Sequence, residues 1–173
     1  PLNSRLPYAV VKNVGESFCR SYHKEYGLEY TVFRFFNTYG PKQSPDFVIS
    51  RFLKLAFQNS PLTIYGDGTQ SRTFCYIDDN TETTLRILEG NLMVNGVINI
   101  GSEKNYQIVD LAREVIRLTN SKSTIQFLPP LKEGDMTRRQ PDSSRMMEIL
   151  NRELTPLDQG IKAILDSPSL LLE

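Results

Sequence analysis

The sequence predicts an α/β fold. Segments rich in aromatic and β-branched residues, the composition of buried strands, alternate with segments in which apolar residues recur at helical spacing. Segment 28–36 is typical of the first kind and segment 107–119 of the second. Few of these segments form regular strand–helix–strand units, but the mixture still favours the α/β class. At 173 residues the chain is one domain of ordinary size or a large part of a bigger protein.

Turn residues and periodicity place the elements along the chain. We expect helices over residues 7–27, 46–59, 78–89, 107–119, 143–150 and 157–165, and strands over 28–36, 61–65, 73–77, 97–100 and 124–127. The turn Gly66-Asp67-Gly68 predicts that the strands on either side of it pair as a hairpin. Asp78 or Asp79 is expected to cap the helix that ends at Glu89.

Three of the predicted helices carry an apolar face that we expect to be buried. In the first helix this face comprises Val11, Val14, Phe18 and Tyr22. In helix 46–59 it comprises Phe47, Ile49, Phe52, Leu53 and Phe57. In helix 107–119 it comprises Ile108, Leu111, Ala112, Val115 and Ile116.

Composition excludes several function classes. Twenty basic residues balance twenty acidic ones, so no overall field attracts nucleic acid or an anionic membrane. One histidine and two cysteines exclude His-based triads, multi-histidine metal sites and a disulfide framework, so no metal site is expected. No apolar run approaches the ~20 residues of a membrane span, and no signal peptide is visible. We therefore expect a protein of the reducing cytoplasm.

Tyr8 and Lys12 lie four residues apart in the first predicted helix, and Glu16 follows four residues later. Residues at this spacing share one helix face. An ammonium beside a phenol favours the phenolate, so Tyr8 is a candidate general base. Because such pairs also arise by chance, the alternative is an amphipathic helix with Tyr and Lys on its polar edge. Glu16 is interpreted as a helix-face partner for a basic neighbour.

Strand 28–36 leads directly into the turn Asn37-Thr38-Tyr39-Gly40-Pro41. Ligands of open α/β sheets bind at the carboxyl ends of strands. This loop is therefore a candidate ligand-binding segment.

Five motifs occur in order along the chain. They are Tyr8-x-x-x-Lys12 with Glu16, Arg34-Phe-Phe-Asn37-Thr-Tyr-Gly40-Pro41, Tyr65-Gly-Asp-Gly68-Thr-Gln70-Ser-Arg72-Thr-Phe-Cys-Tyr76-Ile-Asp78-Asp79, Asn99-Ile-Gly101 and Arg138-Arg139-Gln-Pro141-Asp142. Together they resemble the extended short-chain dehydrogenase/reductase family of NAD-dependent epimerases and dehydratases that act on nucleotide-sugars. The resemblance covers nearly all of the chain and favours the catalytic interpretation of Tyr8 and Lys12.

The resemblance implies the C-terminal part of an NAD(P)-binding Rossmann-like fold, namely the end of the parallel sheet plus a smaller α/β domain that binds the sugar nucleotide. Residues 1–40 would end the dinucleotide-binding domain, and residues 41–173 would form mainly the substrate domain. The family's Gly-x-x-Gly-x-x-Gly turn and its catalytic Ser or Thr have no counterpart in this sequence. We therefore expect this chain by itself to be inactive. The resemblance also implies NAD as cofactor, a UDP- or dTDP-sugar as substrate, and a homodimer to which the first helix contributes.

The resemblance assigns a role to each candidate site residue. Tyr8 would take a proton from a sugar hydroxyl, Lys12 would bind the nicotinamide ribose, and Thr38 would lie near the nicotinamide. The substrate-binding residues would lie along the nucleotide-sugar. Val48 and Arg51 would contact the nucleobase, Tyr65 and Gln70 would line the nucleotide pocket, and Arg72 would bind the diphosphate. Asn37 at the strand exit would bind a diphosphate or sugar oxygen, and Arg139 would lie near a sugar carboxylate. The alternatives are structural: a turn-forming Asn37, a surface Arg72 on a hairpin, and a solvated basic loop at 138–139.

Two of the motifs favour one of the family's reactions over the others. Arg139-Gln-Pro141-Asp142 and the run at residues 34–41 resemble the UDP-glucuronate decarboxylases, which act through a 4-keto intermediate. Tyr8-Ala-Val-Val-Lys12 looks more like the form found in 4-epimerases and dTDP-glucose 4,6-dehydratases. Decarboxylation is therefore the leading hypothesis, with dehydration and epimerisation as alternatives. An alternative of another class is a non-catalytic binding or assembly module that retains the fold.

Overall fold

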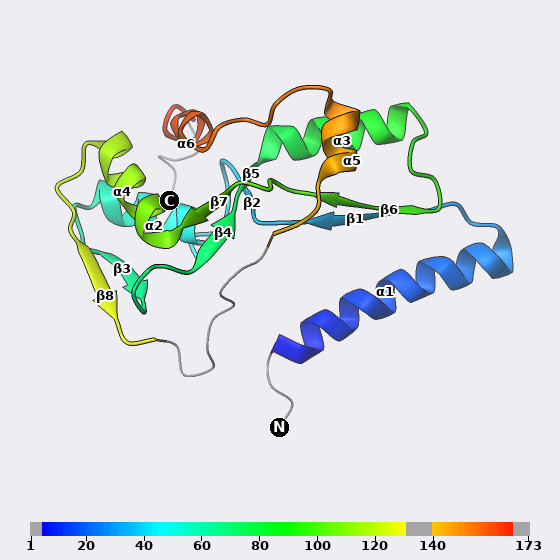
Figure 1. The fold of residues 1–173 in the computed structure, drawn as a ribbon, viewed down its shortest axis with the longest axis horizontal. Helices are drawn as coiled ribbons and strands as arrows, with labels where there is room; N and C mark the ends of the chain where they lie inside the picture. Colours follow the sequence, from blue (N-terminus) through cyan, green and yellow to red (C-terminus); the bar gives the residue numbers. More distant parts are fainter. Residues whose placement is uncertain (1–4, 131–139, 168–173) are drawn as a thin grey trace.

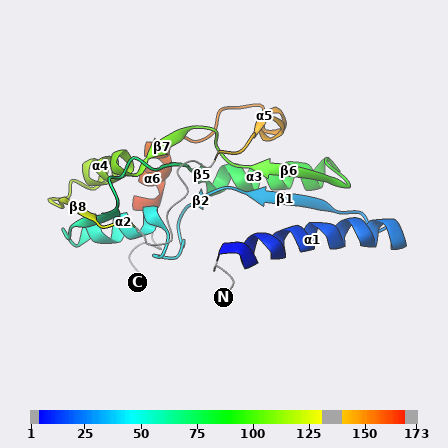
Figure 2. The same cartoon turned by 60° about the horizontal axis from the view of Figure 1, so that its bottom comes forward.

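The computed structural model describes residues 5–130 and 140–167, with side chains from residue 8 onward. Two parallel strands, β1 (Thr31–Phe35) and β6 (Gly96–Ile100), lie at the centre of one half of the molecule. Helix α1 (Arg5–Tyr26) lies along one face of this pair, and helices α3 (Ile77–Glu89) and α5 (Ser144–Leu150) cover the other face (Figures 1 and 2). A parallel pair with helices on both faces agrees with the predicted fold class.

The described strands form four separate pairs. Besides β1–β6, strand β2 (Thr38–Tyr39) pairs in parallel with β5 (Cys75–Tyr76), and β3 (Leu62–Tyr65) pairs in parallel with β8 (Ile125–Leu128). Strand β4 (Ser71–Thr73) pairs antiparallel with β7 (Asn105–Gln107). All four pairs join segments more than 30 residues apart, so the sheets depend on contacts between distant parts of the chain.

The predicted hairpin of strands 61–65 and 73–77 is wrong, because β3 pairs with β8 and β4 pairs with β7. The carbonyl oxygens of Gly68 and Gln70 accept hydrogen bonds from the backbone N–H groups of Val109 and Ile108, at 3.1 Å each. A helix start has backbone N–H groups without partners in the helix. Helix α4 (Ile108–Thr119) thus holds the chain between β3 and β4 and prevents it from folding back on β3.

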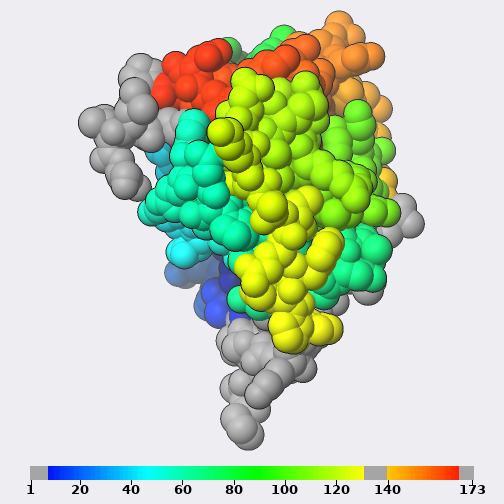
Figure 3. All heavy atoms as spheres, turned by 90° about the vertical axis from the view of Figure 1, so that its left-hand side faces the viewer, coloured from blue at the N-terminus to red at the C-terminus, as the bar shows by residue number. Residues whose placement is uncertain are grey.

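Two clusters of buried apolar side chains form the core. The larger joins α2 (Val48–Phe57), α4 and α6 (Leu157–Leu165) to β3, and Figure 3 views the molecule from this end. The smaller comprises Cys75, Ile87, Ile98, Ile100, Met146 and Leu150, which lie between the β1–β6 pair and the helices above it. The chain passes between these clusters several times. The division at residue 40 stays a prediction.

Helix α2 buries a narrower face than the sequence predicts. Its buried residues are Ile49, Phe52, Leu53 and Ala56, at the i, i+3, i+4, i+7 spacing of one stripe. Phe47 and Phe57 are more than half exposed, which contradicts the prediction for these two side chains. Phe47 has an extended backbone just before the helix and therefore lies outside its periodicity. Phe57 is the last residue of the helix and is rotated by about 100° from Ala56, the last buried residue.

Helix α3 begins without a side-chain cap, so the predicted capping role of Asp78 or Asp79 is wrong. Asp79 is fully buried, and its carboxylate accepts hydrogen bonds from Arg152 at 2.7 Å and from the backbone N–H of Thr155 at 2.9 Å. A buried carboxylate requires such partners. Asp79 therefore ties the segment between α5 and α6 to helix α3.

The predicted apolar face of α1 is exposed in this chain. Val11, Val14, Phe18 and Tyr22 are between 45% and 65% exposed, which contradicts the expectation of burial. Within the described residues, Glu16 is the only side chain of α1 that forms hydrogen bonds with a strand, and its partner is Arg34 of β1. No helix in the described ranges is both long and apolar enough to span a bilayer.

Candidate active site

The loop that follows β1 forms one wall of a cavity of about 470 Å³. Residues 37–43 line this cavity together with Tyr8 from α1, Phe35 from β1, Phe47 and Ile77. None of the described residues that line it is a carboxylate, whereas Lys42 contributes a positive charge. The cavity is thus suited to a ligand rich in acceptor oxygens. We refer to it below as the Tyr8 pocket.

Tyr8 and Lys12 lie together on α1, as their spacing predicts. The Lys12 Nζ atom lies 5.3 Å from the centroid of the Tyr8 ring. A cation at this distance is attracted to the face of the ring. Tyr8 is 64% exposed and borders the pocket, so its hydroxyl is accessible to a ligand. The ammonium of Lys12 and the ring of Tyr8 are therefore in contact beside the pocket.

Asn37 is the second residue after the end of β1 and has a φ angle of 41°, in the left-handed region. Asparagine is one of the few non-glycine residues that tolerate this region. Its carbonyl accepts a hydrogen bond from the backbone N–H of Cys75 at 3.2 Å, which fixes the turn. Its side-chain Nδ2 is buried and has no hydrogen-bond partner among the described residues. A buried donor without a partner is costly, so this amide is a candidate to bind a ligand oxygen.

Thr38 lies beside Asn37 on the pocket wall and is held at two atoms. Its hydroxyl oxygen accepts a hydrogen bond from the Asn80 Nδ2 at 2.5 Å, and its backbone carbonyl accepts one from the Gln43 Nε2 at 2.6 Å. The Gln43 Oε1 in turn accepts a hydrogen bond from the Ser50 hydroxyl of α2 at 3.1 Å. The pocket wall is therefore joined to α3 on one side and to α2 on the other.

Gly40 permits the close approach of this loop to α3. A Cβ atom at position 40 would lie 2.5 Å from the Cγ2 of Ile77, which real structures do not allow. Any larger residue would push the loop away from the start of α3, and with it the residues that line the pocket.

Glu16 does not reach the Tyr8 pocket. Both of its carboxylate oxygens accept hydrogen bonds of 2.7 Å from Arg34, and Arg20 donates a third at 3.2 Å. These bonds, with that of Arg34 the largest cause, hold the pKa of the Glu16 carboxyl below its ordinary value. The interpretation of Glu16 as a partner for a basic neighbour agrees with these contacts.

The other substrate-binding candidates lie elsewhere in the described structure. Val48 packs on the larger core cluster, and the Arg51 Nε is buried without a hydrogen-bond partner among the described residues. The Gln70 Nε2 donates to the Tyr65 carbonyl at 3.0 Å, and the Arg72 Nη1 donates to the Ser71 carbonyl at 2.7 Å. None of these five lines the Tyr8 pocket in the described part of the chain.

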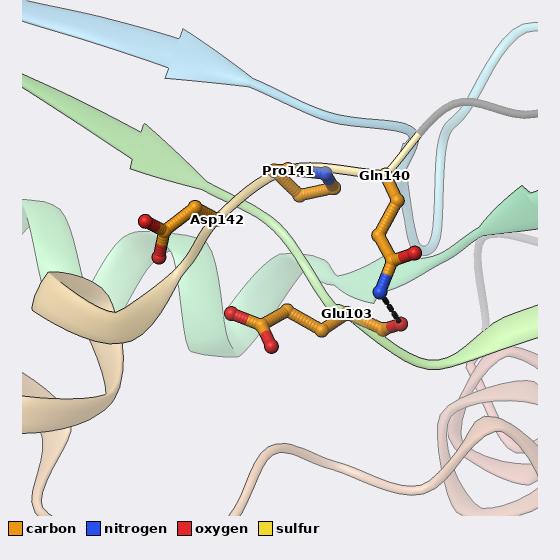
Figure 4. A pocket seen from close by; sticks show the side chains of 4 residues that line it. All are labelled: Glu103, Gln140, Pro141 and Asp142. Carbon is orange, nitrogen blue, oxygen red and sulfur yellow. Dashed lines mark hydrogen bonds between the residues drawn. The ribbon is translucent and has the colours of Figure 1, made fainter.

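Arg139 lies outside the described residues. Its neighbours Gln140, Pro141 and Asp142 line a second, shallower hollow of about 570 Å³ with Glu103 (Figure 4). The Gln140 Nε2 donates a hydrogen bond to the Glu103 carbonyl at 2.9 Å, which attaches this segment to the chain after β6. The hollow is acidic, in contrast to the Tyr8 pocket.

Three residues at or near the Tyr8 pocket are not among the predicted site residues, namely Lys42, Gln43 and Asn80. Lys42 and Gln43 directly follow the Gly40-Pro41 turn, so extending the candidate loop by two residues would have found them. Asn80 is a polar residue on the buried face of a predicted helix. Asparagine is seldom buried, so its place on an apolar face is the one feature of the sequence that could have identified Asn80 as a candidate.

A family profile described as the NAD dependent epimerase/dehydratase family matches residues 1–101. The chain belongs to this family. It is 36% identical over 155 residues to UDP-glucuronic acid decarboxylase 3 of Arabidopsis thaliana, covering 88% of this chain and 44% of that protein. It is 38% identical over 168 residues to UDP-N-acetyl-alpha-D-glucosaminuronate decarboxylase of Bacillus cytotoxicus, covering 91% of this chain and 51% of that protein.

A solved structure supports the same relationship. The UDP-glucuronic acid 4-epimerase of Bacillus cereus, in complex with UDP-glucuronic acid and NAD, matches with a TM-score of 0.82 and 35% identity, covering 92% of this chain and 51% of that one. The chain thus spans about half the length of the relatives that it matches. The Rossmann-like α/β fold and the family predicted from the motifs are confirmed, and NAD is confirmed as the cofactor of the family.

Proposed function

We propose that the intact protein is an NAD-dependent UDP-glucuronate decarboxylase and that this chain carries its general base and most of its sugar-nucleotide site. The observation that carries the proposal is that Tyr8, with Lys12 over its ring, borders the same cavity as the unpartnered amide of Asn37. A base and an oxygen-binding donor in one cavity are what oxidation of a sugar hydroxyl requires. The names of the two decarboxylase relatives support the choice of an acidic sugar.

The residues of this chain would act as follows. Tyr8 accepts the proton of the sugar 4-hydroxyl, and the Lys12 ammonium stabilises the resulting charge. NAD, when bound, supplies the hydride acceptor for this oxidation and returns the hydride at the end of the cycle. The Asn37 Nδ2 donates to a phosphate or sugar oxygen, and the Arg72 guanidinium binds the diphosphate. The unpartnered donor of Asn37 and the positive Lys42 fit such an oxygen-rich, anionic ligand.

Decarboxylation then follows from the chemistry of the substrate. A 4-keto-uronic acid is a β-keto acid, so its C5–C6 bond breaks with loss of carbon dioxide and the electron pair forms an enolate that takes up a proton at C5. Tyr8 returns its proton to the 4-oxygen when the ketone is reduced. Arg139 would hold the carboxylate until it leaves as carbon dioxide.

The test uses the full-length protein that contains this chain, incubated with UDP-glucuronate and NAD. We expect release of carbon dioxide and formation of a UDP-pentose, with both lost in Tyr8→Phe. If UDP-glucuronate is converted to its C4 epimer without release of carbon dioxide, the reaction is epimerisation and the proposed decarboxylation is wrong. This second candidate is favoured by the Tyr8-Ala-Val-Val-Lys12 form and by the likeness to the Bacillus cereus epimerase.

A non-catalytic module makes a different prediction. Such a protein would bind neither NAD nor a UDP-sugar, or would bind them without any turnover of UDP-glucuronate, UDP-glucose or dTDP-glucose. Calorimetric titration with NAD and UDP, followed by product analysis with the three sugars, separates this class from the enzymes.

The full-length protein is further proposed to be a homodimer. The exposed apolar stripe of α1, formed by Val11, Val14, Phe18 and Tyr22, supports this proposal because stripes of this kind mark protein contacts. Sedimentation of the full-length protein should give twice the monomer mass, and Phe18→Asp should shift the equilibrium toward monomer. A monomeric full-length protein would contradict the proposal.

A further inference from the structure

Three side chains meet where β2, β5 and α3 join. Thr38 of β2 lies opposite Cys75 of β5 in the parallel register. The Cys75 thiol donates to the Asn80 Oδ1 at 2.9 Å, and the Asn80 Nδ2 donates to the Thr38 hydroxyl oxygen at 2.5 Å. These two contacts form a chain of hydrogen bonds from the buried core to the wall of the Tyr8 pocket.

This chain of hydrogen bonds determines whether the Thr38 hydroxyl can act as a donor or as an acceptor in the pocket. A hydroxyl has one proton to donate and lone pairs that accept. In Thr38 the oxygen already accepts from Asn80, and among the described residues its proton has no acceptor. Thr38 lines the pocket. Its proton is therefore available to an acceptor atom inside the pocket.

Asn80 is well suited to impose this orientation. It is 2% exposed, so its amide cannot exchange its partners for water. Burial raises the pKa of the Cys75 thiol to about 12, which keeps the thiol protonated and able to donate to the Asn80 oxygen. With the amide oxygen occupied by a donor, the amide nitrogen faces Thr38 and presents its own donor there.

We propose that Asn80 is a positioning residue that keeps the Thr38 hydroxyl as a donor toward an acceptor oxygen of NAD bound in the Tyr8 pocket. This inference rests on the proposed function. Asn80 does not line the pocket and would act through Thr38 alone. Its effect on NAD binding should therefore disappear when the Thr38 hydroxyl is removed.

A double-mutant cycle in the full-length protein tests this. The dissociation constant of NAD is measured by calorimetry for the wild type, Thr38→Val, Asn80→Leu and the double variant, with thermal unfolding recorded for each. One neutral hydrogen bond corresponds to roughly 2- to 12-fold in affinity, so each single variant should weaken NAD binding by a factor in that range. The double variant should bind no more weakly than Thr38→Val.

Two further variants separate positioning from a general loss of structure. Thr38→Ser keeps the hydroxyl and should keep both the affinity and its dependence on Asn80. Thr84→Val is the matched control, because Thr84 lies on the same helix and its hydroxyl donates to the Asn80 backbone carbonyl at 2.8 Å. It should leave NAD binding unchanged. If Asn80→Leu alone does not fold, the double variant carries the test, because replacing both partners by apolar groups is close to neutral for stability.

The outcomes distinguish the two proposals. Additive losses in the cycle, or an effect of Asn80→Leu that persists in the Thr38→Val background, would overturn the positioning role while leaving the enzymatic function in place. A wild-type protein that binds no NAD would overturn the proposed function and this inference with it.

Discussion

Glu16 of α1 and Arg34 of β1 form two hydrogen bonds of 2.7 Å between one carboxylate and one guanidinium. The Glu16 side chain is 12% exposed and that of Arg34 is 46% exposed. Two parallel bonds of this kind orient the partners as well as attract them. Because the apolar face of α1 makes no core in this chain, this pair fixes how the helix that carries Tyr8 lies against the sheet.

Removing the Glu16 charge should therefore loosen α1. We expect Glu16→Gln to lower the free energy of unfolding by about 1 kcal/mol, since the half-exposed guanidinium of Arg34 returns to water. Urea unfolding measures the change. Glu25→Gln, on an exposed position of the same helix, is the control and should change stability little.

The same pair predicts a pH dependence. The folded-state pKa of Glu16 lies below its ordinary value, so its stabilising effect is complete above about pH 4.5 and is lost as the pH falls through the folded-state value. The difference in stability between the wild type and Glu16→Gln should thus be constant from pH 7 to pH 5 and should shrink below that. A difference that grows on acidification would contradict the ion pair.

Tyr8→Phe removes the proposed base and leaves the ring under Lys12 in place. Loss of a general base costs about 10²- to 10⁴-fold in turnover. We expect kcat of the full-length enzyme to fall by that factor while the affinities for NAD and UDP change less than about threefold. Tyr26→Phe, at the other end of α1, should retain full turnover. Equal turnover in both variants would refute the assignment of Tyr8.

Asn37→Asp replaces the unpartnered donor by an acceptor of the same shape. Aspartate also tolerates the left-handed backbone at this position, so the turn should persist. A negative charge in the pocket should repel an anionic ligand, and we expect the affinity for a UDP-sugar to fall at least about tenfold. Asn120→Asp is the matched control, because Asn120 has a φ angle of 50° and ends α4 far from the pocket. Calorimetric titration compares the two.

Asp79→Asn tests the buried tie between α3 and the segment before α6. The amide loses the charge that pairs with Arg152, whose remaining carboxylate partner among the described residues is Glu82. Because Arg152 is partly exposed and keeps one carboxylate, we expect a loss of about 2 kcal/mol, less than the cost of breaking a fully buried pair. Asp78→Asn, one residue earlier and exposed, should change stability by less than about 0.5 kcal/mol. Equal melting temperatures for the two variants would contradict the structural role.

Much of the site follows from local sequence. The helical spacing of Tyr8 and Lys12 places them together, and Asn37 and Thr38 line the pocket just after the carboxyl end of β1. These relations span a few residues and depend on helix and strand geometry alone. The contacts of Tyr65, Gln70, Arg72 and Arg139 with a ligand stay predictions.

The sequence by itself determined the α/β class, the approximate limits of the helices and the family, because periodicity and ordered motifs are properties of neighbouring residues. Only the tertiary structure decided that β3 pairs with β8, that Asp79 binds Arg152 rather than a helix start, and that Asn80 contacts Thr38. Each of these joins residues 42 or more positions apart. The pairing of such distant groups is set by how the whole core packs, which no local pattern encodes.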